Sequence, residues 1–487
     1  MESESSRTPA QARQEMLAKM PVKRLLWKLA VPAVTGMLTM ALYNVVDTIY
    51  IGRGVGSIGI AAVTVSFPVM VVLMALGQMA GMGASSVISR NLGSGNIHRA
   101  QLSLGNAVAL SVGSGLLITL VGLPNSAALL QLIGASDAVL PHAKDYLDVI
   151  LIGAAFAAYP MAMNNLARAE GNARVAMTNM VGGALLNIAL DPIFIFGLNM
   201  GVQGAAIATV IAHLATSIYI TRYFLSRHST LRLTLPSLKL DSSVTREIVA
   251  IGFPSFIRMA GMSFLLLIVN RTLGLYGGDL SIAAYGIIHR VLNLTVMPLM
   301  GIGQGLQPIL GFSYGARQYG RSYAVTRYAL IAASGFALAT FVLLFFLPTP
   351  VVRIFTNDPE LIAIGVHASR YVFSAFFVVG FQVVGSVVFQ SLGHIGRTLV
   401  TSTSRHVLFR IPLILVLPRL FEANGVWLTF PIADALAALL VFVLVIPQLR
   451  EFKRLRDMQT KQQPDSHTIV ASDIEVEALA RESGEEV

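Results

Sequence analysis

The middle of this chain is too apolar to be surrounded by water. Of the 487 residues 60 are charged, and 8 of these fall in residues 1–24 and 15 in residues 450–487. The 425 residues between these ends hold the other 37, about 9% of that stretch, whereas soluble domains carry roughly 25% charge. A soluble core of that size cannot form, so lipid must surround this part of the chain. We therefore predict an all-α polytopic membrane protein.

Twelve segments are long and apolar enough to cross a bilayer as helices, each needing about 20 residues. Lys and Arg then indicate the orientation, because they gather in cytoplasmic loops. With the N-terminus inside, the inner loops hold thirteen Lys and Arg residues, Arg168 and Arg405 among them, and the outer loops and span ends hold five. We predict a multi-pass protein of the plasma (inner) membrane with both termini cytoplasmic. The approximate span limits are 25–51, 58–84, 101–122, 141–165, 174–196, 203–224, 247–272, 280–312, 323–347, 361–389, 397–418 and 425–449.

The chain repeats itself at a period of about 222 residues. Each repeat holds six spans, an even number, so both halves enter the membrane from the same side and are related by a pseudo-two-fold axis along the membrane normal. This predicts a cytoplasmic N-terminal segment (1–24), a first lobe (25–224), an inter-lobe loop (225–246), a second lobe (247–449) and a cytoplasmic tail (450–487). Two such lobes around a cavity are the plan of an alternating-access transporter. The matched residues are Pro32 with Pro254, Ala61-Ala62 with Ala283-Ala284, Gly93 with Gly315, and Gly171 with Gly393.

The first lobe has ionisable side chains inside its spans, where they are costly and therefore candidates for function. Asp47 lies in span 1 and Asp191 in span 5, with Asn187 one turn before Asp191 on the same helix face. Pro192 follows and can loosen the helix, because proline lacks a backbone donor. Asp47, Asp191 and Thr209 of span 6 each lie five or six residues from an outer span end, roughly 7–9 Å deep at 1.5 Å per residue. We predict that these groups form one site.

Three interpretations of this set stay open from the residues alone. The side chains could only hydrogen-bond between helices, the carboxyl groups could take up and release protons, or the same oxygens could hold a sodium ion. Tyr43 lies one turn below Asp47, and Tyr146 enters span 4 from the same side.

The second lobe lacks this acidic set, since the period places Val269 opposite Asp47 and Leu413 near the counterpart of Asp191. It carries arginines and one acid instead. We predict a structural ion pair between Arg410 and Asp434, and structural or cavity-lining roles for Arg258 and Arg290.

Several classes of function are excluded. The chain has no cysteine, so thiolate chemistry and disulfides are absent. It has no Walker loop and no hydrolase or metalloprotease motif, so we expect no enzyme and transport powered by an ion gradient. The basic residues sit between apolar spans instead of on one face, which argues against nucleic-acid binding.

The chain resembles the multidrug and toxic compound extrusion (MATE) family over roughly residues 20–450, and its prokaryotic DinF-like branch in particular. The resemblance is carried by Tyr43-Asn44-Val45-Val46-Asp47-Thr48-Ile49-Tyr50-Ile51-Gly52 in span 1 and by Leu186-Asn187-Ile188-Ala189-Leu190-Asp191-Pro192-Ile193 in span 5. It implies a coupling site for a proton or sodium ion at Asp47, Asn187, Asp191 and Thr209, and a substrate cavity with Tyr43, Tyr146 and Asn164. The second-lobe sodium site of the NorM-like branch is not expected, because span 7 has Arg258 and no carboxylate.

The resemblance implies a secondary antiporter that exports amphipathic, often cationic, organic compounds in exchange for protons or sodium, with no other cofactor. We expect a monomer in the lipid bilayer. The alternative in the same superfamily is a flippase for lipid-linked precursors, which would need a large basic cavity. A channel or an intramembrane enzyme is a more distant alternative.

Overall fold

The computed structural model describes residues 9–462, and within them the chain is helical with no β-strand. A short helix, α1 (Pro9–Lys19), precedes the first crossing. The acidic end of the predicted cytoplasmic tail (Glu475, Glu477, Glu482, Glu485 and Glu486) lies outside the described residues. The first-lobe helices are α2 (Val22–Gly54), α3 (Ser57–Gly93), α4 (Ile97–Gly122), α5 (Ser126–Ile133), α6 (Leu140–Ile152), α7 (Ala154–Ala169), α8 (Ala173–Pro192) with the π turn η2 (Ile193–Gly197), and α9 (Gly201–Leu225).

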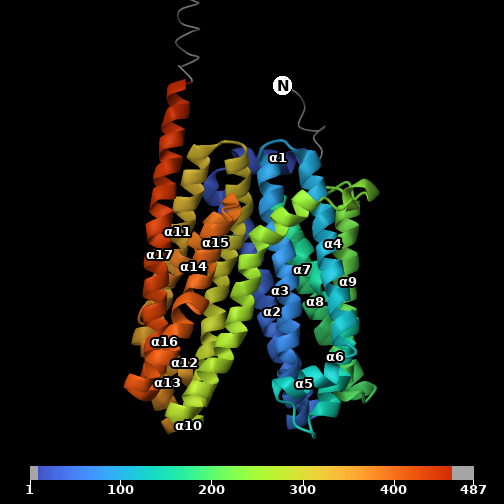
Figure 1. The fold of residues 1–487 in the computed structure, drawn as a ribbon, viewed down its shortest axis with the longest axis vertical. Coiled ribbons are helices and arrows are strands. Elements are labelled where there is room, and N and C mark those ends of the chain that lie inside the picture. Colours follow the sequence, from blue (N-terminus) through green and yellow to red (C-terminus); the bar gives the residue numbers. More distant parts are fainter. Residues whose placement is uncertain (1–8, 463–487) are drawn as a thin grey trace, which may run out of the picture.

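The second lobe follows a connecting segment that contains the 3-10 turn η3 (Leu235–Leu238). The 74-residue α10 (Ser242–Gly315) leaves helical geometry at Gly278, and its two arms meet there as a hairpin (Figure 1). The last helix, α17 (Pro418–Gln462), has a similar break at Glu422. The intervening helices are α11 (Tyr319–Phe346), α12 (Pro348–Arg353), α13 (Pro359–Phe373), η4 (Phe376–Val378), α14 (Val379–Leu392), α15 (Ile395–Thr403), the π turn η5 (Ser404–Arg410) and α16 (Ile411–Val416).

The described helices account for the twelve predicted crossings. Nine are long and apolar enough to span a membrane, and two bent pairs, α6 with α7 and α13 with the helix after it, add two more. Because α10 turns back at Gly278, it contributes two crossings where its length alone would count one. Most helices run several residues past the predicted limits; span 2, for example, continues to Gly93 instead of ending at 84.

The repeat is visible in the backbone as well as in the sequence. Residues with left-handed backbone geometry, a conformation that favours glycine, occur at corresponding connections in the two halves. Gly56 and Gly278 join the first two spans of each lobe, and Gly171 and Gly393 join the fourth to the fifth. The bends also correspond, since the fourth span breaks by 55° at Gly153 and the tenth by 42° between α13 and η4.

The two lobes touch at the end of the molecule that holds α1 and the end of α17, and they diverge toward the other end (Figure 1). We call these the closed end and the open end. At the closed end glycines allow the backbones to meet: a Cβ on Gly93 would lie 2.0 Å from the Phe312 carbonyl oxygen, and one on Gly315 would lie 2.0 Å from that of Arg90. Small residues permit this close packing of helices in membranes.

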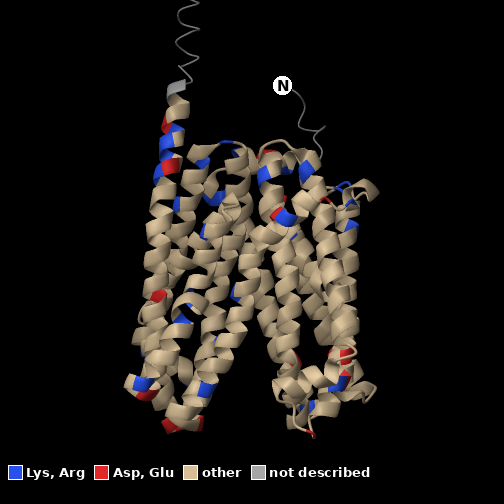
Figure 2. Ribbon diagram, viewed as in Figure 1, with Lys and Arg blue, Asp and Glu red and all other residues tan. Residues whose placement is uncertain are grey.

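An ion-pair cluster also joins the lobes at the closed end. Glu247 at the start of α10 accepts from Arg90 of α3 at 2.9 Å and from Arg99 of α4 at 2.7 Å. Lys and Arg gather at this end, while the middle of both lobes is largely uncharged (Figure 2). The exposed surface between the two ends carries large apolar side chains such as Leu214 and Ile331, as a lipid-facing surface requires.

Candidate coupling site and central cavity

The first lobe encloses a pair of carboxyl groups. Asp47 of α2 is 9% exposed and Asp191 of α8 is fully buried, and the two carboxyl groups lie within hydrogen-bond reach of each other. Immediately after Asp191, α8 ends at Pro192 and gives way to the π turn η2. A proline removes one backbone donor, and π turns are common at functional sites. The acid pair therefore lies beside an irregular part of its helix.

Asn187 and Thr209 complete this cluster as predicted from their depth. The hydrogen-bonding partners orient the Asn187 amide so that its nitrogen donates to Oδ2 of Asp191 at 3.0 Å. Its oxygen accepts from the backbone N–H of Thr209 at 3.1 Å and from the Thr209 hydroxyl at 3.3 Å. The structure thus brings α2, α8 and α9 together at one site, which we call the coupling site (Asp47, Asn187, Asp191 and Thr209).

One oxygen of each acid lacks a partner. Oδ1 of Asp47 and Oδ1 of Asp191 are buried and accept no hydrogen bond within the described chain. Two carboxylates this close repel each other unless a proton or a cation lies between them. The oxygen-rich set suits either a proton or a hard cation such as sodium. The described residues contain no group of three His, Cys, Asp or Glu side chains suited to a metal ion.

The structure places the two predicted cavity tyrosines beside the coupling site. The Tyr43 hydroxyl lies within hydrogen-bond reach of the Thr209 side chain. Buried Tyr146 donates to the sulfur of Met70 at 3.7 Å. Neither tyrosine lines the central cavity, whereas Asn164 does. Asn164 also accepts a hydrogen bond from Asn179 of α8 at 2.9 Å.

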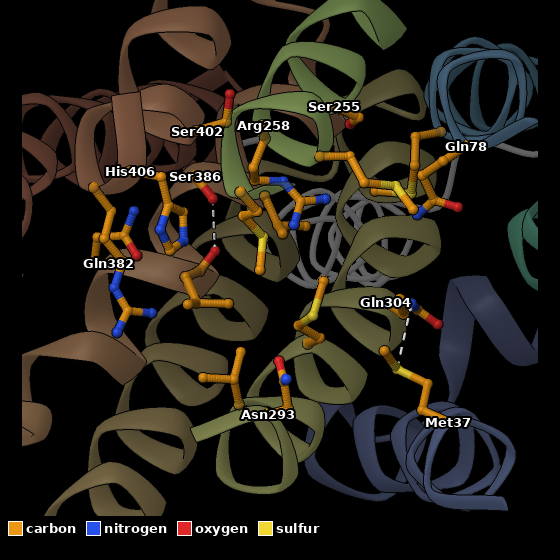
Figure 3. A pocket seen from close by; sticks show the side chains of 18 of the residues that line it. Met37, Gln78, Ser255, Arg258, Asn293, Gln304, Gln382, Ser386, Ser402 and His406 are labelled. Carbon is orange, nitrogen blue, oxygen red and sulfur yellow. Dashed lines mark hydrogen bonds between the residues drawn. The ribbon is translucent and has the colours of Figure 1, made fainter. Parts of the chain in front are cut away.

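The central cavity lies between the two lobes and has a volume of about 400 Å³, within the range of small-molecule sites, roughly 300–1,000 Å³. Figure 3 shows side chains of α3 and α10 facing those of α14 and the eleventh span across it. Seven methionines contribute to its wall, together with the aromatic rings of Tyr285 and Phe430. Methionine adapts its shape to varied apolar partners. The methionines are Met37, Met82, Met161, Met180, Met259, Met262 and Met300.

Two arginines that the orientation argument placed in inner loops belong to this cavity, so those placements were wrong. Arg168 lies inside α7, is 7% exposed and donates to Asn165 at 2.8 Å. Arg405 lies in η5 and is also buried. Neither residue could be assigned to a helix face from the sequence, because Arg168 is near a span end and the π turn changes which residues of span 11 share a face.

Asp434 forms the predicted ion pair with Arg410, at 2.6 Å, and a second one that we did not predict. Arg405 donates to both carboxylate oxygens of Asp434, at 2.8 and 3.1 Å. The π turn brings both arginines to the same acid, although they are five residues apart. Arg258 also lines the cavity, whereas Arg290 is exposed and does not.

Two helices reach both the cavity and the coupling site. Met37 of α2 lines the cavity ten residues before Asp47. On α8, Met180 lines the cavity and Asn187 and Asp191 lie farther along the same helix. A two-lobe bundle with twelve crossings, a cavity between the lobes and a buried acid pair in one lobe defines a multi-pass transporter.

Comparisons with known proteins agree with this class. Residues 32–193 and 254–416 each match the MatE family model, one match in each repeat. The chain therefore belongs to the MatE family of transporters. It is 27% identical over 427 residues to the multidrug export protein MepA of Staphylococcus aureus (strain MSSA476), a match that covers 88% of this chain and 94% of MepA.

Solved structures of the family show the same fold. One is described as the outward-facing conformation of a multidrug resistance MATE family transporter; it is 27% identical, has a TM-score of 0.84, and the match covers 90% of this chain and 98% of that one. A second, from Pyrococcus furiosus Vc1, has the same values, and its description says that a reversed polarity of its binding pocket suggests a different function.

Proposed function

We propose that this protein is a secondary active antiporter that exports small amphipathic organic compounds from the cell in exchange for protons or sodium ions. The observation that carries the proposal is the buried Asp47–Asp191 pair, each with one unpartnered oxygen, on the two helices that also reach the central cavity. An ion taken up by this pair would change the position of α2 and α8, and hence the cavity wall. That link is the coupling that antiport requires.

The transport cycle follows from this arrangement. At the outer side, a proton or sodium ion enters between Asp47 and Asp191, and α2 and α8 rearrange near Pro192 and η2. The cavity wall formed by Met37 and Met180 moves with them, and the substrate leaves. The lobes then rock to open the closed end, the ion departs into the cytoplasm, and a new substrate binds.

The orientation of the Asn187 amide bears on the choice of ion. In the orientation described, its N–H donates to Asp191, which suits an acid pair that shares a proton. In the opposite orientation its oxygen would face Asp191, as a neutral sodium ligand would. Both ions therefore stay within the proposal, and no other cofactor is part of it.

We place the protein as a monomer in the plasma membrane with both termini in the cytoplasm. The Lys and Arg at the closed end support that orientation. The described conformation is then open toward the outside, since the lobes are joined at the cytoplasmic end and diverge at the other (Figure 1).

A flippase for lipid-linked precursors is the second candidate, because the cavity contains several arginines. Its volume of about 400 Å³ suits a drug-sized molecule better than a lipid-linked head group. The match to multidrug export proteins over most of the chain also supports efflux.

The test is gradient-driven export from proteoliposomes loaded with two fluorescent amphipathic probes, one anionic and one cationic. A proton gradient and a sodium gradient are imposed separately. Wild-type protein is compared with Asp47→Asn, Asp191→Asn and, as the matched control, Asn44→Ala, which changes an exposed polar residue of α2. We expect one gradient to drive export of at least one probe, and both Asp variants to lose that export by at least about tenfold while Asn44→Ala retains it.

Export that persists in both Asp variants would contradict the coupling role of the pair. If neither gradient moves either probe, antiport is contradicted, and lipid flipping becomes the leading candidate.

A further inference from the structure

The charges around the central cavity do not balance. Four arginines line it, and among the lining residues that the structure describes there is no Asp or Glu. Arg405 and Arg410 share one carboxylate, that of Asp434, which lies behind them. The formal charge around the cavity is therefore positive, even with this acid included.

Two of the arginines have no acidic partner among residues 9–462, which the structure describes. Arg168 of the first lobe donates to the neutral amide of Asn165. Arg258 of the second lobe makes no hydrogen bond or ion pair within the described part of the chain. In Figure 3 its side chain extends through the middle of the cavity, between His406 on one side and Gln78 on the other. The cavity is thus approached by an unpaired cation from each lobe.

Two further polar groups at the cavity also favour an anionic substrate. Nε of Arg410 and Nδ1 of His406 are buried and have no hydrogen-bond partner in the described part of the chain, and both residues line the cavity. A ring nitrogen accepts when neutral and donates when protonated, whereas the guanidinium nitrogens of Arg258, Arg168 and Arg410 can only donate. The hydrogen-bond donors that the cavity offers to a substrate therefore belong mainly to cationic side chains.

This arrangement discriminates between substrates by charge. A cationic compound would be repelled by Arg258 and Arg168 in a site shielded from water, and would find no carboxylate on the wall. A carboxylate, sulfonate or phosphate group would pair with the guanidinium groups, and such charge-assisted hydrogen bonds are about twice as strong as neutral ones.

The rest of the wall fits an apolar body attached to that group. Met259 and Met262 follow Arg258 on the cavity face of α10, and Met37 and Met300 also contribute. Flexible thioether side chains accept many shapes. The cavity therefore combines one fixed requirement, for negative charge, with a tolerant apolar surface.

We propose that the central cavity selects small amphipathic organic anions, with Arg258 as the residue that recognises the anionic group and Arg168 as its counterpart from the first lobe. The proposal rests on the proposed export function and reverses the charge that the family resemblance implied. It assigns to the cavity a substrate class of carboxylated, sulfonated or phosphorylated amphiphiles.

The test uses Trp427, which packs against cavity-lining Tyr285 with ring centroids 6.4 Å apart. The chain has two tryptophans, so Trp27→Phe leaves Trp427 as the reporter. Energy transfer from Trp427 to dansylglycine, which carries a carboxylate, is compared with transfer to dansylcadaverine, which has the same fluorophore and an ammonium group. Purified protein in nanodiscs is titrated with each probe, alone and with the cavity variants.

We expect dansylglycine to saturate the signal at a concentration at least about tenfold lower than dansylcadaverine, as one charge-assisted contact of this kind provides. Arg258→Gln removes this preference, Arg258→Lys retains part of it, and Arg290→Gln, an exposed arginine of the same helix, leaves it unchanged. Thermal unfolding of each variant checks that it is folded.

Equal or tighter binding of dansylcadaverine would overturn the proposal, and so would a preference that persists when both Arg258 and Arg168 are changed to Gln. Absence of energy transfer from Trp427 to either probe would also count against it. This readout needs no gradient, so a failure of antiport and a failure of anion selectivity are seen in separate experiments.

Discussion

At the scale of single residues, the two repeats carry opposite charges in corresponding spans, although not at positions that the repeat period matches. The fifth span has Asn187 and Asp191 facing Thr209 of the sixth. The eleventh span, its repeat counterpart, has Arg405 and Arg410 facing Asp434 of the twelfth. One lobe therefore presents acids that lack cations, and the other presents cations that outnumber their acid. The proposed separation of ion and substrate sites rests on this asymmetry.

The buried acid of the second lobe should be important for stability. Asp434→Asn would leave Arg405 and Arg410 without their carboxylate in a site where both are under 9% exposed. Breaking a buried pair by removing one partner costs about 3–5 kcal/mol. We expect a clear drop in the thermal unfolding temperature of the purified protein. Asp279→Asn, which changes an exposed acid of the same lobe, should leave that temperature unchanged, and equal effects of the two variants would refute this role.

The sequence predicted the acidic site better than the cavity. Asp47, Asn187, Asp191 and Thr209 could be grouped because depth along a regular helix follows from residue counting. Arg168 and Arg405 could not be assigned to the cavity in this way, because the face to which a side chain points depends on helix rotation and on the π turn η5. Tyr43 and Tyr146 were assigned to the cavity by resemblance, and they lie by the acids instead.

At the scale of elements, paired glycines hold the closed end together. The Gly93–Phe312 and Gly315–Arg90 approaches are repeat-related, and each leaves no room for a side chain. A larger residue at either position must push α3 away from α10. The repeat predicted that these glycines correspond, but their contact across the two lobes required the structure.

We predict that Gly93→Leu opens the closed end. The chain has no cysteine, so Ser86→Cys supplies a single reporter at a buried position where the serine hydroxyl donates to the Gln390 carbonyl at 2.6 Å. With Gly93 intact, the reporter should resist maleimide, and with Gly93→Leu it should react several-fold faster. Gly113→Leu is the matched control, because a Cβ at Gly113 meets open space. Unchanged protection in the Gly93 variant would contradict the packing argument.

The inter-lobe segment is attached to the first lobe through one buried acid. Glu170 accepts from the Ser229 hydroxyl and the Thr230 amide, both at 2.9 Å, and from the Tyr223 hydroxyl. Burial raises the pKa of Glu170 above its usual value, and the Arg13 guanidinium opposes that rise. These donors therefore stabilise the buried Glu170 carboxylate, and the carboxylate in turn holds the donors in place.

Glu170→Ala should therefore release the segment. Trypsin would cut at Arg227 or Arg232 several-fold faster, because their backbone would no longer be held against α9. Limited proteolysis followed by mass spectrometry measures the rate. Glu360→Ala, which changes an exposed acid of the second lobe, serves as the control, and equal cleavage rates in the two variants would show that Glu170 does not anchor the segment.

At the scale of the whole molecule, the proposed ion and substrate sites are two separate sites joined by α2 and α8. Met37 and Asp47 share one helix, and Met180 and Asp191 share the other. Coupling between separate sites is reciprocal, so an ion that weakens substrate binding must itself be bound less tightly when substrate is present.

The most direct measurement is therefore substrate affinity, read by energy transfer from Trp427, as the proton and sodium concentrations are varied separately. For the wild-type protein we predict that raising the concentration of the coupling ion weakens substrate binding by at least about fivefold, the lower end of typical coupling between sites. In Asp47→Asn and Asp191→Asn the affinity should no longer depend on that ion. A dependence that survives in both variants, or its absence in the wild-type protein, would contradict the proposed coupling of ion and substrate by this acid pair.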